Sequence, residues 1–216
     1  MKSLSYLHMS ERIFKTDLQY FGSIHFVKTL MENKNVLFDL EAPFTKMSFK
    51  NRMVIITSQG PLMLTIPIVG GRDQKTPIKD IAIAYDSPWS AQHLKSITTS
   101  YKRAPYFEYY EQSLHALYLK KPSKLVDFLL LCTEWLEIQL KVNWDLKQTY
   151  DQVTIDALLK YQDPWLPKNY SQIEGLPKYQ QVFTDENDFI TNASILDMLF
   201  CVGGREINKL WAPPVR

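Results

Sequence analysis

The chain of 216 residues carries 25 basic and 23 acidic side chains, so its formal net charge is only +2. So small an imbalance argues against a protein that coats nucleic acid, and a hydrophobic content of 45% argues against a disordered or fibrous chain. No apolar run approaches the ~18 residues that a membrane-spanning helix requires. No signal peptide is indicated either, so we expect a cytoplasmic protein without a membrane span.

We expect one domain over residues 1–216, with residues 1–8 as a ragged extension because Met9 offers an alternative start. The two cysteines, Cys132 and Cys201, lie in apolar surroundings and are expected to be small buried hydrophobes. A disulfide between them stays an open alternative. The four histidines have no acidic or cysteine partner at ligand spacing, so no metal site is predicted. Neither a cofactor nor an oligomeric state is indicated.

The N-terminal residues predict a βαβ unit. Residues 11–16 are expected to form a strand, and residues 24–31 a helix, since apolar side chains recur at helical spacing at Ile24, Val27, Leu30 and Met31. Ser23 is a suitable N-cap for this helix. Residues 36–40 then form a second compact strand. A strand, a short helix and another strand favour parallel pairing.

The next segment predicts a β-hairpin. Residues 51–56 and 62–69 are its two arms, joined by a turn at residues 59–61. Pro67 places the second arm at a sheet edge or a bulge, because proline cannot donate a ladder hydrogen bond. A polar, glycine-led loop over residues 70–77 follows, and residues 78–84 alternate enough to predict one more strand.

From Ser87 onward the pattern is helical, beginning with an apolar stripe of Trp89, Leu94 and Ile97. Further helices are predicted over residues 106–119, from Ser123 through an apolar face ending at Leu136, and over residues 194–202, where two glycines end the helix. Residues 145–177 give a weak pattern. The sequence therefore predicts an α/β fold: an N-terminal mixed sheet that begins with a βαβ unit, followed by a mainly helical C-terminal half packed on it.

The first candidate for chemistry is the segment from Lys46 to Arg52. It brings two lysines, an arginine, Ser48 and Asn51 to the start of a strand. Charge-assisted hydrogen bonds from such groups suit a phosphate or carboxylate, and Arg52 could bind an anion through two parallel bonds where Lys46 could not. The ordinary alternative is a solvated start of a strand.

The second candidate follows Asp86. On a helix, Trp89 and His93 lie four residues apart on one face, so an imidazole beside an indole could act as a general acid or base with a stacking wall. Lys95, Tyr101 and Tyr106 follow closely. The alternative is a surface histidine whose tryptophan neighbour lies in the core. His25 is a weaker candidate, at a helix N-terminus where an anion could bind.

Taken in order, these segments resemble the WbqC-like protein family. The resemblance runs from about residue 14 to residue 203. It rests on the order and spacing of Tyr20-Phe21-Gly22, Lys46-x-Ser48-Phe49-x-Asn51-Arg52, Thr65-Ile66-Pro67-Ile68, Ile78-Lys79-Asp80-Ile81, Trp89-x3-His93-x-Lys95, Tyr101-x3-Pro105-Tyr106-Phe107, Tyr179-x2-Val182-Phe183 and Ser194 to Phe200. The chain departs from the usual pattern at residues 39–44, where many members carry a polar motif, and at Ser23, where proline is common.

The resemblance implies a cytoplasmic enzyme of bacterial cell-surface polysaccharide (O-antigen-like) biosynthesis, with a transferase acting on an activated or amino sugar as the reaction class it suggests. The alternative is a non-catalytic accessory protein of the same machinery. The implied partner is an anionic small molecule such as a nucleotide sugar, and nucleic acid is not expected.

The enzyme interpretation gives each candidate residue a role. It makes His93 and Lys46 catalytic, and it assigns substrate binding to Ser48, Asn51, Arg52, Trp89, Lys95, Tyr101 and Tyr106. The sequence leaves open whether the Lys46–Arg52 segment and the Trp89–His93 helix share one pocket. Convergence of Arg52, Asn51, His93 and Tyr106 on one concave pocket would favour the enzyme over the accessory protein.

Overall fold

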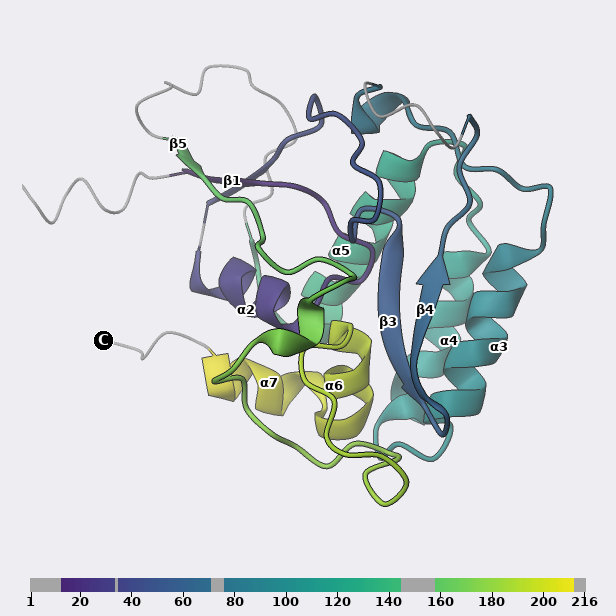
Figure 1. Ribbon diagram of the computed structural model, residues 1–216, viewed down its shortest axis with the longest axis vertical. Helices are drawn as coiled ribbons and strands as arrows, with labels where there is room; N and C mark the ends of the chain where they lie inside the picture. The colour runs from purple at the N-terminus through teal and green to yellow at the C-terminus, as the bar shows by residue number, and fades with distance from the viewer. Residues whose placement is uncertain (1–12, 34, 71–75, 145–157, 212–216) are drawn as a thin grey trace, which may run out of the picture.

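The computed structural model describes residues 13–33, 35–70, 76–144 and 158–211 (Figure 1). The expectation of an N-terminal extension lies outside the described residues, as does most of the predicted loop at 70–77. Within the described part the chain forms a mixed α/β fold, in which a parallel sheet is followed by a mainly helical C-terminal half. The predicted fold class is confirmed.

A three-stranded parallel sheet forms the N-terminal layer, with strand order β2-β1-β5. Strand β1 (Ile13–Thr16) pairs in parallel with β2 (Val36–Phe38), and helix α2 (Ile24–Glu32) connects them. The Ser23 hydroxyl accepts a hydrogen bond from the Phe26 N–H at 3.2 Å, which confirms the predicted N-cap. On its other side β1 pairs in parallel with β5 (Leu158–Lys160), which belongs to the segment that gave no clear sequence pattern.

The predicted hairpin is also confirmed. Strands β3 (Arg52–Thr57) and β4 (Gly60–Thr65) pair antiparallel as a separate two-stranded sheet. The tight turn lies at residues 58–59, one residue earlier than predicted, and Gly60 already belongs to β4 with φ 93°. Strand β4 ends before Pro67, which has no place inside a ladder.

The strand predicted over residues 78–84 is wrong. A short 3₁₀ helix, η1 (Ile78–Asp80), occupies its start, and the rest forms only isolated bridges, from Ala82 to Lys124 and from Ile83 to Ile68. The side chains of Ile78, Ile81 and Ile83 are all buried. The apolar residues therefore anchor an irregular segment on the core, and their spacing resembled the alternation of a strand.

The helical half consists of α3 (Trp89–Tyr101), α4 (Phe107–Tyr118), α5 (Leu125–Leu140), α6 (Ile195–Val202) and α7 (Gly204–Trp211), and a second 3₁₀ turn, η3, covers Tyr170–Gln172. In Figure 1 the hairpin stands in front of α3 and α4. Helices α3 and α6 contact β3. Gly203 ends α6 as predicted, but the chain starts a further helix at Gly204 that sequence patterns did not reveal.

Residues 193–195, at the start of α6, bind back to the N-terminal part of the chain. The Ser194 N–H donates to the Val54 carbonyl of β3 at 2.8 Å, and the Ser194 hydroxyl donates to the Phe21 carbonyl at 2.6 Å. The Ile195 N–H donates to the Gly22 carbonyl at 2.9 Å. Residues 193–195 therefore fasten the turn before α2 to the hairpin, and α6 starts from that junction.

Candidate functional site

The loops that follow β1 and β5 meet at one edge of the parallel sheet. Strand β1 lies between β2 and β5, and the chain leaves β1 through α2 toward β2. The carboxyl ends of β1 and β5 therefore flank the point where the connections diverge, which is where open parallel sheets commonly bind ligands.

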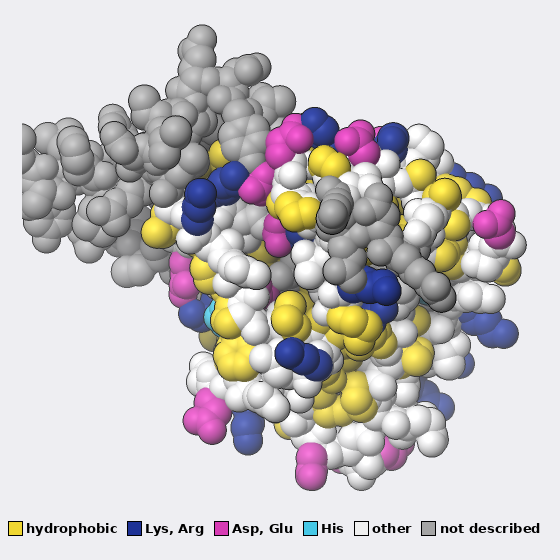
Figure 2. Space-filling model, turned by 45° about the horizontal axis from the view of Figure 1, so that its top comes forward, with side chains coloured by type: hydrophobic (Ala, Val, Ile, Leu, Met, Phe, Trp, Pro, Cys, Tyr) yellow, Lys and Arg dark blue, Asp and Glu magenta, His cyan; other side chains and the backbone are white. Residues whose placement is uncertain are grey.

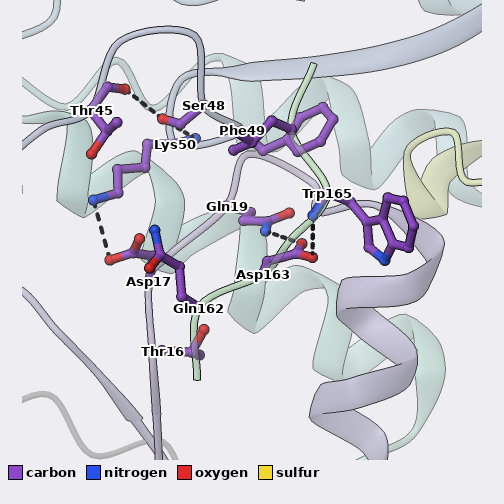
Figure 3. Close-up of a pocket in the computed structure, with 11 residues that line it drawn as sticks. Thr16, Asp17, Gln19, Thr45, Ser48, Phe49, Lys50, Gln162, Asp163 and Trp165 are labelled. Atoms are coloured by element: carbon purple, nitrogen blue, oxygen red, sulfur yellow. Dashed lines mark hydrogen bonds and ion pairs between the residues drawn. The ribbon is translucent and has the colours of Figure 1, made fainter. Parts of the chain in front are cut away.

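A small polar hollow of about 40 Å³ lies at this edge, and Figure 3 shows its lining. We call it the edge pocket. Three segments build it: Thr16, Asp17 and Gln19 after β1; Gln162, Asp163, Trp165 and Leu166 after β5; and Thr45, Ser48, Phe49 and Lys50 from the segment before β3. Its volume suits a few water molecules at most.

An ion pair between the buried Lys50 and the partly exposed Asp17 forms one side of the edge pocket. The Lys50 side chain is only 4% exposed, and its ammonium lies 3.2 Å from an Asp17 carboxylate oxygen. It also donates to the Pro43 carbonyl at 3.0 Å. Ser48 steadies the backbone nearby, since its hydroxyl donates to the Thr45 carbonyl at 2.6 Å. A buried ammonium is costly unless it is paired in this way.

Asp163 organises the other side. It accepts hydrogen bonds from the Gln19 side-chain amide at 2.7 Å and from the Trp165 N–H at 3.1 Å. His25 Nδ1 lies 3.6 Å from the same carboxylate and has no hydrogen-bond partner among the described residues. The His25 ring meets Trp165 edge-on, with ring centroids 6.1 Å apart. A carboxylate beside an imidazole could orient or accept a proton there.

We expect replacement of Lys50 by methionine to lower the free energy of unfolding by about 1–2 kcal/mol. The change leaves the Pro43 carbonyl without its donor and the Asp17 carboxylate without its cation, although Asp17 is 38% exposed and keeps water. Urea denaturation followed by circular dichroism measures the loss. The matched control is Lys28→Met, which removes an exposed pair with Glu32 and should cost below about 0.5 kcal/mol. Equal losses of unfolding free energy in the two variants would show that the Lys50–Asp17 pair contributes no more to stability than the Lys28–Glu32 pair does.

A larger hollow, the hairpin pocket, has a volume of about 460 Å³, within the usual range for small-molecule sites. Lys46, Asn51, Arg52 and Thr65 supply its polar groups, and Phe44, Met47, Ile66, Pro67 and Ile68 supply an apolar wall. Residues 44–52 contribute to both this hollow and the edge pocket. On the face seen in Figure 2, basic side chains lie among exposed apolar ones.

The hairpin pocket contains two cationic side chains, Lys46 and Arg52. Within the described residues, neither Lys46 nor Arg52 forms an ion pair. The Arg52 Nη1 rests against the sulfur atoms of Met47 and Met63, at 2.7 and 3.6 Å, and its buried Nε has no hydrogen-bond partner in that part of the chain. Asn51 differs, because its side-chain amide already donates to the Ile66 carbonyl at 2.8 Å.

The candidate residues do not line one common pocket, which answers the question that the sequence left open. Lys46, Asn51 and Arg52 meet in the hairpin pocket, and Ser48 lines the edge pocket. Lys95 is exposed on the outer face of α3 beside His115, and Tyr106 begins α4 at a separate hollow. Trp89, His93 and Tyr101 are buried in the core. The cause is the helical period of α3, which turns these three toward the core and Lys95 to solvent.

His93 lies one layer behind the hairpin pocket. Its Nδ1 is 3.0 Å from the Tyr20 hydroxyl, which also bonds the Tyr118 hydroxyl, and its ring hydrogen-bonds the backbone of Thr65. Burial lowers the pKa of His93 from its ordinary value of 6.5 to about 4, although the Thr65 bond opposes the change. The imidazole is therefore neutral at pH 7, and its contacts are with the core. Its catalytic role stays a prediction.

Sequence patterns did not single out Asp17, Gln19 or Asp163, and Lys50 was noted only as the second lysine of the candidate anion-binding segment. The signal that could have identified such residues is their position directly after a strand, because polar residues that follow parallel strands gather at one sheet edge. For Asp17 this signal was present, since β1 and β2 were predicted. For Asp163 it was absent, because β5 has only three residues and follows a weakly patterned segment.

A family model described as the WbqC-like protein family matches residues 18–161. The match begins just after β1, ends just after β5, and includes every residue that lines the hairpin pocket. Comparisons with curated proteins and with solved structures give no match. In the described part of the chain, no helix is long and apolar enough to cross a membrane, and no cluster of three or more potential metal ligands occurs.

Proposed function

Because the chain belongs to the WbqC-like protein family, we propose that it is a cytoplasmic enzyme of bacterial cell-surface polysaccharide biosynthesis, a transferase acting on an activated or amino sugar. The family supports the biological setting. The hairpin pocket supports the substrate class, and the observation that carries the proposal is the meeting there of Lys46 and Arg52 without a carboxylate partner in the described residues.

The chemistry of the hairpin pocket suits a ligand with an anionic and an apolar part. The Arg52 guanidinium can hold a phosphate or carboxylate through two parallel hydrogen bonds, and its buried Nε has no acceptor among the residues that the structure describes. Lys46 is exposed and adds a second positive charge. A sugar or base ring would lie against Met47, Pro67 and Ile68, the apolar lining residues that are not buried. A nucleotide sugar combines these features.

The proposed roles follow from position in the pocket. Arg52 binds the diphosphate, and Lys46, the predicted catalytic residue that reaches this hollow, neutralises the leaving group or transfers its proton. Asn51 orients the Ile66 carbonyl at the wall. Ser48 positions the backbone between the two pockets.

A non-catalytic accessory role is the second candidate. It is favoured by the separation of the two predicted catalytic residues, since Lys46 lines the pocket and His93 is buried behind it. An accessory protein would bind the same anion without turnover. An activity assay distinguishes the two roles. The chain is incubated with a nucleotide sugar and with cell extract as the source of acceptor, and chromatography follows the release of the free nucleotide.

We expect Arg52→Ala to weaken binding of a nucleotide sugar such as UDP-glucose at least about tenfold, which corresponds to ~1.4 kcal/mol. Isothermal titration calorimetry measures this effect, and nucleotide sugars with other bases and sugars extend the screen. Arg52→Lys should also lose affinity, because an ammonium cannot make the paired bonds of a guanidinium. Arg103→Ala is the matched control, since Arg103 is an exposed arginine outside the hairpin pocket.

Two results would contradict the proposal. One is unchanged affinity in Arg52→Ala, and the other is an equal loss in Arg103→Ala. The affinity of the unaltered chain should also fall as the salt concentration rises, because ions screen the attraction of exposed charges.

A further inference from the structure

A third hollow, the tyrosine pocket, lies between the start of α4, the end of α5 and the junction of α6 with α7. Its volume is about 590 Å³. Its lining consists of Tyr106, Tyr109, Tyr110, Ile138, Gln139, Lys141, Val202, Gly203, Gly204, Arg205 and Glu206. It shares no residue with the hairpin pocket.

Tyrosine rings form one wall of this hollow. Tyr109 is 75% exposed and Tyr106 is 42% exposed, whereas Tyr110 is buried between them and the core. The Tyr109 and Tyr110 rings are perpendicular, with centroids 4.9 Å apart. Exposure of large aromatic faces to water in a concavity is unfavourable. A ligand with an apolar face would bury them and gain binding free energy.

Two glycines shape the floor. Gly203 has φ 87°, and a side chain there would meet the Tyr106 ring at 3.0 Å. A Cβ on Gly204 would lie 2.0 Å from the Gln139 carbonyl oxygen, and the Gly204 N–H donates to the Tyr110 hydroxyl at 2.9 Å. The helix junction is therefore packed tightly under the tyrosines, and the ring of Tyr106 is held in place from below.

The polar groups of the rim are mixed in kind. Gln139 and Glu206 offer acceptors, and Glu206 is held by Lys209 at 2.7 Å. Lys141 and Arg205 are exposed cations that form no ion pair within the described residues. Adjacent donors and acceptors suit hydroxyl groups, each of which donates and accepts, and the two unpaired cations suit an added carboxylate.

We propose that the tyrosine pocket binds an acidic sugar ring, such as a hexuronic acid, with one face of the ring stacked on Tyr109 and its carboxylate bound by Arg205. This binding site goes beyond the proposed function, because it requires no reaction and no ligand at the hairpin pocket. Its ligand is recognised through stacking, hydroxyl contacts and charge together. A neutral sugar would satisfy the first two of these alone.

The test uses the full chain and two probes that differ only at C6, methyl glucuronide with a carboxylate and methyl glucoside with an uncharged hydroxymethyl group. Saturation-transfer NMR detects binding, and titration gives the affinity. We expect the glucuronide to bind more tightly, with at least an approximately fivefold loss in Tyr109→Leu and in Arg205→Gln. Tyr109→Phe retains the ring and should bind nearly as the unaltered chain does. Tyr109 is so exposed that these changes should leave the circular dichroism spectrum unaltered.

The other outcomes overturn the proposal. Absence of glucuronide binding at millimolar concentration would do so, as would equal binding by the Tyr109→Leu variant. A loss in Arg52→Ala in place of Arg205→Gln would assign the sugar to the hairpin pocket. UDP-glucose binding is measured in a separate titration. Failure of the proposed function can therefore be distinguished from failure of this binding-site proposal.

Discussion

Replacement of Asp197 by alanine is expected to lower the free energy of unfolding by about 3–5 kcal/mol, the largest effect of any single substitution considered. Asp197 is fully buried on α6. One carboxylate oxygen accepts from the Tyr101 hydroxyl at 2.8 Å, and the other accepts from the Gln181 amide at 2.8 Å and from the Tyr179 hydroxyl. Alanine would leave the hydroxyls of Tyr101 and Tyr179 without this acceptor, and the Gln181 amide would keep only the Ile190 carbonyl.

The same cluster reaches the hairpin, because the Tyr101 hydroxyl also accepts from the Ile56 N–H of β3 at 2.9 Å. Asp197 thereby connects α6, α3, β3 and the segment before α6. Urea denaturation followed by tryptophan fluorescence measures the loss.

Asp197→Asn provides a graded comparison. Burial raises the pKa of Asp197 even though the three donors lower it, so its ionised form is costly to bury. Asparagine retains one acceptor and carries no charge, and we expect a smaller loss than for alanine. Asp185→Ala is the control, since Asp185 is exposed and should cost about 0.5 kcal/mol or less. A loss in Asp197→Ala no greater than in this control would show that the cluster is not a major source of stability.

Acidification is expected to destabilise the protein by about 3 kcal/mol through His93 alone. Burial holds the pKa of His93 at about 4 in the folded chain, against its ordinary 6.5. Between these values the unfolded chain binds a proton that the folded chain does not. Stability is therefore unaffected by this group above pH 6.5 and falls as the pH drops from 6.5 to 4. The groups facing the ring, Tyr20 and Tyr118, stay neutral throughout, because burial raises the pKa of both.

Urea denaturation at pH 7, 6, 5 and 4 measures this dependence, and comparison with His93→Gln isolates it from the carboxylates. Glutamine cannot titrate, so the variant should be less stable at pH 7 yet lose less stability on acidification. His115→Gln, which removes an exposed histidine of α4, should leave the slope unchanged. A slope in His93→Gln as steep as in the unaltered chain would contradict the assignment.

Elements fixed by local patterns were predictable. Helix α2 has both a periodic apolar face and a serine cap, and the β3–β4 hairpin joins two apolar runs through a tight turn. The segment after Pro77 was not predictable in this way, because its buried isoleucines are placed by neighbouring loops and not by a ladder. Helix α7 was missed because Gly203 and Gly204 indicate only a helix end, and packing against α5 decides that another helix follows.

The candidate site was predictable in part. The composition of residues 46–52 indicated an anion site, and Lys46, Asn51 and Arg52 do line one hollow. Whether that hollow includes His93 could not be predicted, because the orientation of α3 depends on β3, which lies far away in sequence. The edge pocket depends on β5 in the same way. Non-local contacts determine both the position of His93 relative to the hairpin pocket and the formation of the edge pocket. No local sequence pattern encodes such contacts.

The fastening of residues 193–195 to the turn before α2 has a consequence for biosynthesis. The two partners of the hydrogen bond between Ser194 and Phe21 are 173 residues apart in a chain of 216. Strands β1 and β2 and helix α2 emerge from the ribosome long before the residues that join them to the hairpin. The apolar surface that this junction covers therefore stays exposed until residues 193–195 have been made, and such long loop closures slow folding and expose a nascent chain to aggregation.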